Sequence, residues 1–509
     1  MIRLVPYWLF FLLTIVLISC YQNSVQSKDI KNSSDLAEQY CSSCHKLPMP
    51  DQLDKKSWQK YILPRMGQML GIYNTPTERD SLLRDMAFVP KEIKATLYPV
   101  EALIDMADWY DLQNYYLTNA PDRLSDSAMV NYENLVDSFF QIKKPPLNFS
   151  PPSTCLIYSD TSNQIIMTDA HTQSLLVLDN QWQILKAARI GEAATHIHET
   201  HNEYILTVMG NFTPSDAPNG YLFGLPKTKN GRSGKIVDQL VRPVHSSYED
   251  LDNDGYEDIV IAEFGKWAGK LSIHYGSDTG TYKSKLLLNQ TGAIKSAIID
   301  WDRDGLLDVL ALFGQAREGL KLFLNKGNRN FEAHPLLSFS ASHGSSSFEL
   351  KDMNNDGLKD VIYLAGDNAD FEAIAKPYHG IYIYLRTSDG ELKFDKFIQH
   401  DGVYDITIDD FDQDGRVDIA ANSFFPDYSE NGKQAFIFYK NSDEGYIPYT
   451  LSDSEMGRFI VMHKVDYDND NDIDLLLGSM AFEVPGNTAI TDRWQSEAVP
   501  FYILENKTK

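Results

Sequence analysis

Short apolar runs follow one another through the second part of the chain, and their length and composition predict β-strands. The runs are rich in Ile, Val and Leu, are too short for helices, and are separated by polar turns. Examples are residues 164–168, 174–178, 204–208, 221–223, 259–261, 309–312, 361–364, 419–421 and 475–477. Residues 151–509 are therefore predicted to form an all-β unit.

An aspartate-rich loop of nine residues precedes five of these runs. Side chains at positions one, three and five of such a loop converge on one centre, and position six must turn sharply, which favours Gly or Asn. Aspartate at position nine closes the shell, and hard oxygen ligands select Ca²⁺. Strands rather than helices follow, so these are not EF-hands. The predicted ligands of about five calcium ions are Asp250, Asp252, Asp254, Asp258, Asp300, Asp302, Asp304, Asp308, Asp352, Asn354, Asp356, Asp360, Asp410, Asp412, Asp414, Asp418, Asp466, Asp468, Asp470 and Asp474.

The loops start at residues 250, 300, 352, 410 and 466, a spacing that fits one four-stranded propeller blade each. Strand, calcium loop, strand resembles the FG-GAP/VCBS repeats of the integrin α-subunit head, and Phe264-Gly265 and Phe313-Gly314 add to the likeness. The resemblance implies a β-propeller in which calcium is mainly structural. Residues 151–240 leave room for two metal-free blades, so seven blades are predicted, with six or eight as alternatives. The fifth loop departs from the pattern by having Asn471 in place of glycine.

Residues 33–119 carry helix start signals instead. Ser33 or Ser34 is expected to cap a first helix, Ser57 a second, and Thr75 a third, while Pro99 is expected to open a longer one that ends before Pro121. Residues 120–150 are expected to link the two parts. The chain is thus predicted to be multidomain, with a small all-α domain followed by an all-β propeller.

The first predicted helix leads into Cys41-Ser42-Ser43-Cys44-His45, which matches the attachment site of a c-type haem. Cys41 and Cys44 can both add to the vinyl groups of one porphyrin, and His45 then lies beneath the iron. A structural zinc would need a second pair of ligands nearby, and the next cysteine is Cys155. With the aromatic helix that follows, residues 33–119 resemble a small cytochrome c domain, which implies one covalent haem c.

The sixth iron ligand is left open by the sequence. Met66 precedes a glycine after a proline turn, as in the distal loops of cytochromes c, and Met69 is the alternative. Met49 or an open position are further choices. A Met/His pair suits electron transfer, whereas an open site suits the binding of small ligands.

The N-terminus resembles that of bacterial lipoproteins. Residues 1–19 read as a signal peptide, with Arg3 followed by an apolar run shorter than the roughly 20 residues of a membrane span. The run ends in Leu17-Ile18-Ser19-Cys20, which resembles a lipobox. This resemblance implies lipidation at Cys20, a tether over residues 20–32, and anchorage in the bacterial cell envelope, on the periplasmic face or at the cell surface.

The formal net charge of −25 argues against nucleic acid as a partner, because basic surfaces dominate that kind of binding. Most of the negative excess lies in the aspartate loops. Five bound Ca²⁺ ions would change the charge from −25 to −15.

Residues about five positions before each calcium loop are expected to lie along the central channel of the propeller. Because they are polar, they form a candidate pocket for an acid, a sugar or a redox protein, although each is also a common structural residue. His196 and His198 share one face of a strand, and with His201 they form a less favoured candidate metal site. The candidate channel residues are His196, His198, His245, Lys295, Asp405 and Arg458, with Ser347 at the equivalent place in one further strand.

Three functions remain in competition. The favoured one is a lipid-anchored electron-transfer protein whose propeller is a docking or ligand-binding platform; its redox partner, protein or small molecule, is not identified. The second is an oxidoreductase that passes electrons from a sugar or alcohol to its own haem. The third is a calcium-dependent glycan-binding, lyase or adhesion protein, which would leave the haem without a purpose.

Overall fold

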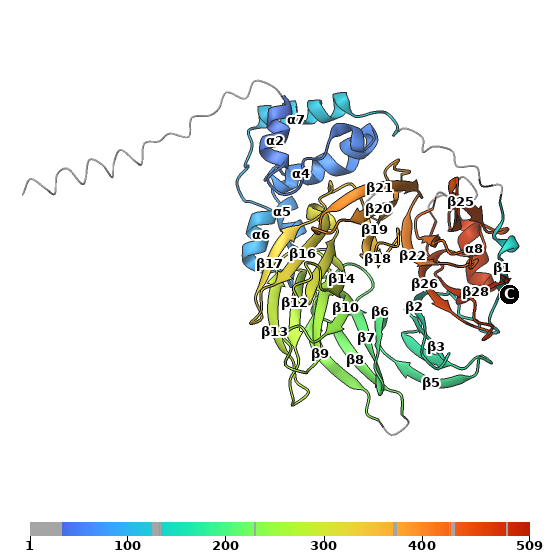
Figure 1. The fold of residues 1–509 in the computed structure, drawn as a ribbon. Helices are drawn as coiled ribbons and strands as arrows, with labels where there is room; N and C mark the ends of the chain where they lie inside the picture. Colours follow the sequence, from blue (N-terminus) through green and yellow to red (C-terminus); the bar gives the residue numbers. More distant parts are fainter. Residues whose placement is uncertain are drawn as a thin grey trace, which may run out of the picture.

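The computed structural model describes residues 33–124, 132, 134–228, 231–369, 374–426, 428, 433–484 and 487–508. Within them, a small helical domain precedes a ring of seven four-stranded antiparallel sheets (Figure 1). The predicted signal peptide and Cys20 lie outside the described residues. None of the described helices is long and apolar enough to cross a membrane.

The helical domain is built from short helices around a small aromatic core. Trp58 and Tyr116 are fully buried with ring centroids 4.2 Å apart, and Leu112 and Trp109 pack beside them. The elements are α2 (Ser33–Cys41), η1 (Pro50–Gln52), α3 (Lys55–Ser57), η2 (Trp58–Ile62), α4 (Leu63–Met69), α5 (Glu78–Arg84), α6 (Lys91–Leu97) and α7 (Met106–Asn119).

Two of the predicted helix starts are wrong, and a third lies two residues early, because α5 begins at Glu78 with Thr77 rather than Thr75 at its N-cap. Asp54 rather than Ser57 caps the second helix, because its carboxylate accepts a hydrogen bond from the Ser57 N–H at 2.7 Å. The long helix starts at Met106 and not at Pro99, since the Leu103 N–H donates to the Leu70 carbonyl at 2.8 Å and holds that segment as a connection.

The seven-bladed propeller is confirmed. The strands of its first four blades are β2 (Thr154–Ser159), β3 (Ile165–Asp169), β4 (Ser174–Leu178) and β5 (Ile184–Arg189); β6 (Glu192–Glu199), β7 (Glu203–Gly210), β8 (Gly220–Pro226) and β9 (Gly234–Leu240); β10 (Pro243–Glu249), β11 (Asp258–Glu263), β12 (Lys270–Tyr275) and β13 (Lys283–Leu288); and β14 (Ala293–Ile299), β15 (Asp308–Phe313), β16 (Gly319–Asn325) and β17 (Phe331–Pro335).

The remaining blades follow the same order, and α8 (Thr488–Glu497) is inserted in the last one. Their strands are β18 (Ser345–Lys351), β19 (Asp360–Ala365), β20 (Gly380–Arg386) and β21 (Leu392–Gln399); β22 (Val403–Asp409), β23 (Asp418–Ser423), β24 (Phe436–Ser442) and β25 (Gly445–Thr450); and β26 (Phe459–Val465), β27 (Asp474–Ser479), β28 (Phe501–Asn506) and β1 (Phe140–Lys143).

The last blade corrects the expected linker. Strand β1 pairs antiparallel with β28, with Phe140 opposite Asn506, so residues from the predicted linker belong to the propeller. Phe140 is 1% exposed and packs on Phe411 and Phe438. Strand β1 completes the four-stranded sheet of the last blade, so strands from both ends of the unit are joined in one blade and hold the ring closed.

The first strand of each blade packs against the first strands of its two neighbours and so lines the centre of the ring. Each of these strands has a register irregularity near its start, at the same place in all seven blades. The residue after the irregularity therefore occupies an equivalent position in every blade. These seven residues are Leu156, His196, His245, Lys295, Ser347, Asp405 and Val461.

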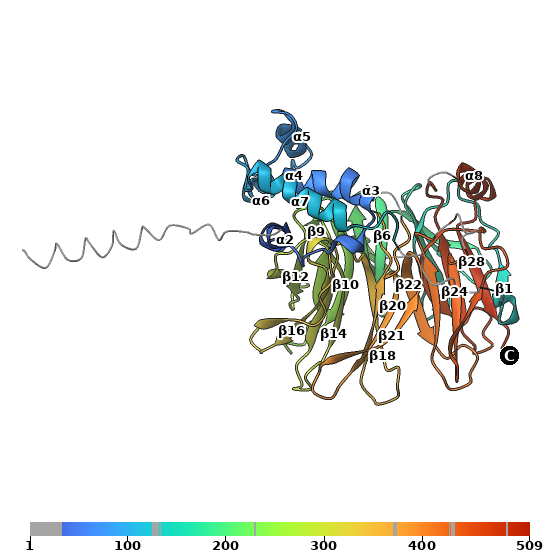
Figure 2. The ribbon, with the colours of Figure 1, turned by 90° about the horizontal axis from the view of Figure 1, so that it is seen from above.

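The helical domain lies on one face of the propeller disc, and α8 lies on the same face (Figure 2). The helical domain contacts the loops that connect second and third strands, and it also contacts the segment before β18. Tyr378 donates to the Gln52 carbonyl at 2.7 Å, and Ser340 donates to the Gln52 side chain at 2.8 Å. The aspartate-rich loops join first and second strands, so the antiparallel order of each blade puts them on the opposite face.

Candidate functional site

The Cys41–His45 motif lies at the end of α2, with its three reactive side chains in different surroundings. Cys41 is buried beside Tyr116, while Cys44 is exposed. His45 places Nδ1 3.0 Å from the Lys46 carbonyl oxygen. A carbonyl only accepts hydrogen bonds, so Nδ1 carries the proton and the lone pair remains on Nε2. Burial lowers the pKa of His45, which keeps the ring neutral, the form that binds metals.

The two candidate methionines pack against different parts of the helical domain. Met66 packs against the core cluster that contains Cys41 and Trp58, whereas Met69 packs against a different cluster around Met86. Adjacent Gly67 lies so close to Trp109 that a Cβ there would meet the ring at 3.0 Å. This close approach holds the part of α4 that carries Met66 against the Cys41 side of the domain.

The motif also contacts the propeller. Arg317 Nε donates to the Cys44 carbonyl at 3.0 Å, and Lys46 Nζ donates to the Ser338 carbonyl at 3.0 Å.

Exposed large apolar side chains are concentrated in the small helical domain, as expected where an apolar group or partner covers them. They include Met49, Leu103, Met106 and Tyr110. The residues present thus fit a covalently attached haem.

The aspartate loops bring their carboxylates together as the spacing predicts. In four loops, three carboxylate oxygens lie within 4.8 Å of one another. The loops turn in the left-handed region at position six, with φ of +89° at Gly255 and +66° at Asn471. The four groups are Asp250, Asp252 and Asp254; Asp300, Asp302 and Asp304; Asp410, Asp412 and Asp418; and Asp466, Asp468 and Asp474.

Aspartate at position nine has a structural role in every loop. Asp418, for example, is fully buried; one of its oxygens accepts the Phe411 N–H at 3.2 Å and the other accepts the Asn441 N–H at 2.8 Å. It thereby ties the loop to the third strand of the blade. Burial raises the pKa of Asp418 to about 6, so a nearby cation would favour its ionised form.

Asp472 is a residue that sequence reasoning missed. It stands at position seven of the fifth loop, where the other loops have Tyr, Leu or Arg. The side chain is 2% exposed, and neither carboxylate oxygen has a hydrogen-bond partner among the described residues. Burial and neighbouring Asp470 raise the pKa of Asp472 to about 7. An additional acidic residue at a position where the other four loops have none was the available signal.

The channel brings four of the predicted pocket residues together. The rings of His196 and His245 have centroids 4.1 Å apart, and Lys295 forms an ion pair with Glu349, which follows Ser347 by two positions on β18. Asp405 faces the same pair from β22, and its carboxylate accepts the N–H groups of Ile406 and Met462 at 3.0 Å. Glu349 was missed because it lies one pleat further along its strand.

Burial sets the charge states in this channel cluster. It lowers the pKa of His196 to about 3 and that of His245 well below its usual range, with Lys295 adding to both effects. Burial alone would lower the pKa of Lys295, but Glu349 and Asp405 raise it. The cluster therefore combines two neutral imidazoles, one ammonium and two carboxyl groups.

Arg458 does not belong to this cluster, so its assignment to the channel pocket is wrong. It is 5% exposed, donates to the Phe424 carbonyl at 2.6 Å, and has its guanidinium 4.1 Å from the Phe424 ring centroid. It precedes β26 and holds loops of the last two blades together. The different spacing of eight residues before the fifth loop was the reason for the error.

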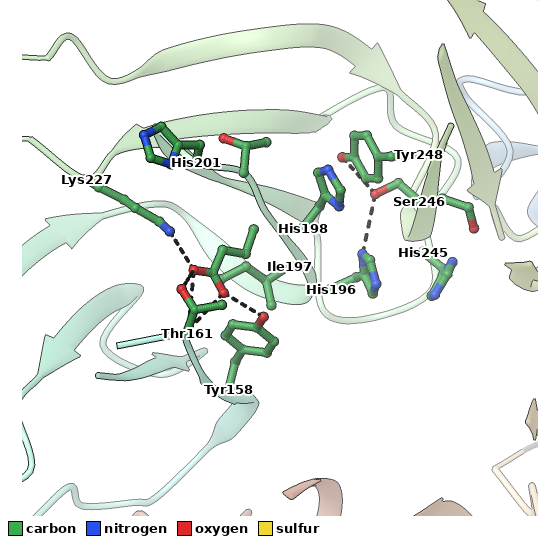
Figure 3. A pocket seen from close by; sticks show the side chains of 13 residues that line it. Tyr158, Thr161, His196, Ile197, His198, His201, Lys227, His245, Ser246 and Tyr248 are labelled. Carbon is green, nitrogen blue, oxygen red and sulfur yellow. Dashed lines mark hydrogen bonds and ion pairs between the residues drawn. The ribbon is translucent and has the colours of Figure 1, made fainter. Parts of the chain in front are cut away.

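A polar pocket of about 630 Å³ opens next to the two histidines, which Figure 3 labels among its lining residues. It lies between the first strands of the first three blades, on the face that carries the aspartate-rich loops, and the first two of these blades lack such a loop. His198 stacks on Tyr248 with centroids 4.0 Å apart and lies 3.4 Å from Glu257. His201 is exposed, and no described group of three possible metal ligands includes the three histidines.

Glu199 is the acidic residue that lines this pocket, and the sequence did not single it out. It accepts hydrogen bonds from Tyr158 OH at 2.9 Å and Thr161 Oγ1 at 2.7 Å, and it pairs with Lys227 at 2.5 Å. These partners hold the Glu199 carboxylate in place and balance its charge.

Asp405→Asn tests the charge states of the channel. Burial raises the pKa of Asp405 to about 6, although Lys295 opposes the shift, whereas the ordinary value is 3.8. Between these values the folded state binds more protons than the unfolded state, so ionisation of Asp405 lowers stability as pH rises from about 4 to about 6. Asparagine removes this dependence. We expect the free energy of unfolding of the variant, relative to that of the wild type, to rise by about 1–3 kcal/mol between pH 4 and pH 7. Urea unfolding at saturating calcium measures this difference.

The matched control is Asp443→Asn, because the Asp443 side chain is 98% exposed. Its unfolding free energy is expected to follow the wild type across the same pH range. A pH-independent difference for Asp405→Asn would contradict the assignment.

Comparison with known proteins agrees with the propeller. Residues 250–311 and 300–363 match the FG-GAP-like repeat family. No curated protein matches the chain. Among solved structures, a catalytically inactive virginiamycin B lyase from Staphylococcus aureus with quinupristin is 12% identical, covering 72% of this chain and 99% of its own, with a TM-score of 0.45. Sqt1 from Saccharomyces cerevisiae is 10% identical, covering 71% of this chain and 97% of its own, with a TM-score of 0.43.

Similarity at that level carries no conclusion about activity. The family match and the strand order together describe the chain: it is a seven-bladed β-propeller with FG-GAP-like repeats at residues 250–363, preceded by a small helical domain. A propeller of this kind is a generic platform for binding and docking.

Proposed function

We propose that this protein is a lipid-anchored electron-transfer protein of the bacterial cell envelope, with one haem c in the helical domain and a calcium-stabilised propeller as its docking platform. The observation that carries the proposal is the state of His45. Its proton is held on Nδ1 by the Lys46 carbonyl, directly after two cysteines, and Nε2 is left to bind iron.

Each residue of the motif has a defined part in this function. Cys41 and Cys44 would hold the porphyrin through thioether bonds, and His45 and Met66 would bind its iron. A haem bound in this way supplies reversible one-electron chemistry, and a Met/His pair raises its potential. Trp58, Trp109 and Tyr116 form the apolar wall behind the motif, which excludes water from that side.

The position of the domain supports a docking role for the propeller. The Cys44 and Lys46 contacts with Arg317 and Ser338 hold the motif against the fourth blade. A partner bound on the same face of the disc would therefore lie beside the helical domain. The negative charge of the chain would favour a partner with a basic surface.

An oxidised-against-reduced visible spectrum tests the proposal. Protein matured in a host that attaches c-type haem is expected to give a low-spin spectrum with the weak far-red methionine–iron band. Met66→Ala should abolish that band and produce high-spin iron, while the matched control Met69→Ala should leave it. Loss of the band in Met69→Ala alone would reverse the assignment, and the absence of covalent haem would overturn the function.

The channel cluster favours a second candidate, an oxidoreductase acting on a sugar or alcohol. The carboxyl group of Asp405, whose pKa is raised to about 6, is suited to accept a proton from a hydroxyl group. The low pKa values of His196 and His245 keep their imidazoles neutral, so these rings would hydrogen-bond a ligand rather than take its proton. However, the pocket opens on the calcium-loop face, whereas the haem motif lies on the opposite one. A seven-residue inner strand such as β10 separates them by roughly 20 Å. Reduction of the haem by an added sugar would favour this candidate over the first.

A further inference from the structure

A second pocket, of about 410 Å³, lies between the helical domain and the third blade. Its walls come from η2 and α4 on one side and from the loop between β11 and β12 on the other. Three cations line it, Lys60, Arg65 and Lys266, together with a single carboxylate, that of Asp85. In a chain with a net charge of −25, this local positive balance is unusual.

Among the residues that the structure describes, none of these three cations forms an ion pair with a carboxylate. Lys60 instead lies 4.7 Å from the centroid of the Tyr61 ring, and the Arg65 guanidinium lies 5.5 Å from that of Trp267. Cations that converge on a concave site without carboxylate partners are suited to an anionic ligand.

The aromatic wall of the pocket is rigidly built. One carboxylate oxygen of Asp216 accepts the backbone N–H groups of Lys266, Trp267 and Ala268 at 2.8, 2.7 and 2.9 Å. Gly265, with φ of +59°, makes the turn that this requires, since a Cβ there would meet the Gly269 nitrogen at 2.4 Å.

Trp267 meets the helical domain at Tyr98, with ring centroids 6.3 Å apart in an edge-to-face arrangement. Tyr61 also lines the pocket. Three aromatic rings beside three unpaired cations distinguish this site from a simple phosphate site, which needs no ring faces, and from a site for a neutral sugar, which needs no cations.

We propose that this pocket binds an aromatic anion, a small fused-ring molecule that carries carboxylate or sulfonate groups. The rings would pack against Trp267, Tyr61 and Tyr98, and the anionic groups would reach Arg65, Lys60 and Lys266. The pocket-facing residues Pro64, Arg65 and Gln68 lie on a different face of α4 from Met66, which packs into the core with Cys41. The site therefore does not depend on the haem assignment.

Calorimetric titration of the calcium-loaded full-length protein, as matured in its host, tests this proposal, with anthraquinone-2,6-disulfonate as the probe. We expect saturable binding to one site that weakens as salt is added, because the anionic contacts are partly exposed. Arg65→Gln and Trp267→Leu should each weaken binding at least tenfold. Lys60→Gln should weaken binding of the probe less. Because Lys60 is exposed, this variant still tests the site if Trp267→Leu disturbs the contact between Trp267 and the helical domain.

Arg84→Gln is the matched control, because this exposed arginine donates to Ser81 and is not among the residues that line the pocket. Its affinity for the probe should equal that of wild type. Three results would overturn the proposal: no saturable binding, equal affinity in the Arg65 and Trp267 variants, or full competition by inorganic sulfate at the concentration of the probe. Binding only to a Cys41→Ala/Cys44→Ala variant without haem would assign the pocket to the haem instead.

Discussion

Cells that mature c-type cytochromes are expected to yield this protein with one covalently attached haem, and a Cys41→Ala/Cys44→Ala variant with none. Both thioether bonds need these sulfur atoms, and His45 alone would hold a haem only by coordination. The haem absorbance that survives denaturation in alkaline pyridine measures the difference. The effect is all or none, the largest expected for any substitution in this chain.

Cys155→Ala is the matched control for that experiment. Cys155 is a buried cysteine of the propeller whose thiol donates to the Ser153 carbonyl at 3.4 Å, far along the chain from the haem motif. The variant should keep the full amount of covalent haem. Equal loss of haem in both variants would show that folding, and not attachment, is responsible.

Removal of calcium is expected to lower the stability of the propeller strongly. Each loop gathers carboxylates that repel one another, and a cation present at a hundred times its dissociation constant stabilises the folded state by about 2.7 kcal/mol per site. Thermal unfolding with added EGTA should therefore start well below that in millimolar CaCl₂. Mg²⁺ at the same ionic strength should restore little, because it keeps its own hydration shell.

Asp410→Ala isolates one loop in this experiment. Asp410 accepts the N–H groups of Asp414 and Gly415 at 3.0 and 2.9 Å and belongs to the first position of its loop. The calcium-dependent part of the unfolding free energy should fall by about 2–3 kcal/mol. Asp443→Ala, at a fully exposed side chain near the same loop, should leave it unchanged. Identical melting curves in EGTA and calcium would refute a structural role for the metal.

Local sequence was sufficient for the repeats and for the equivalent channel positions. Strands, acidic turns and their period are short-range features, and a fixed distance from each loop defined the ring that includes His245, Lys295 and Asp405. Arg458 was assigned wrongly because it lies eight residues before its loop, whereas Val461, at the fixed distance of five, occupies the equivalent position. Glu349 and Glu199 escaped notice because neither belongs to a motif, and only the packing of neighbouring blades gives them partners.

The sequence by itself determined the repeating blades, the acidic loops and the Cys-Ser-Ser-Cys-His motif, because each is written in residues close together along the chain. Only the tertiary structure decided how the ring closes, since β1 pairs with β28 across the whole propeller. It also decided that Met66 and not Met69 shares a core with Cys41, because the face a side chain presents depends on what packs against the helix. The pocket between Arg65 and Trp267 exists for the same reason: two distant segments form it only when the domains dock.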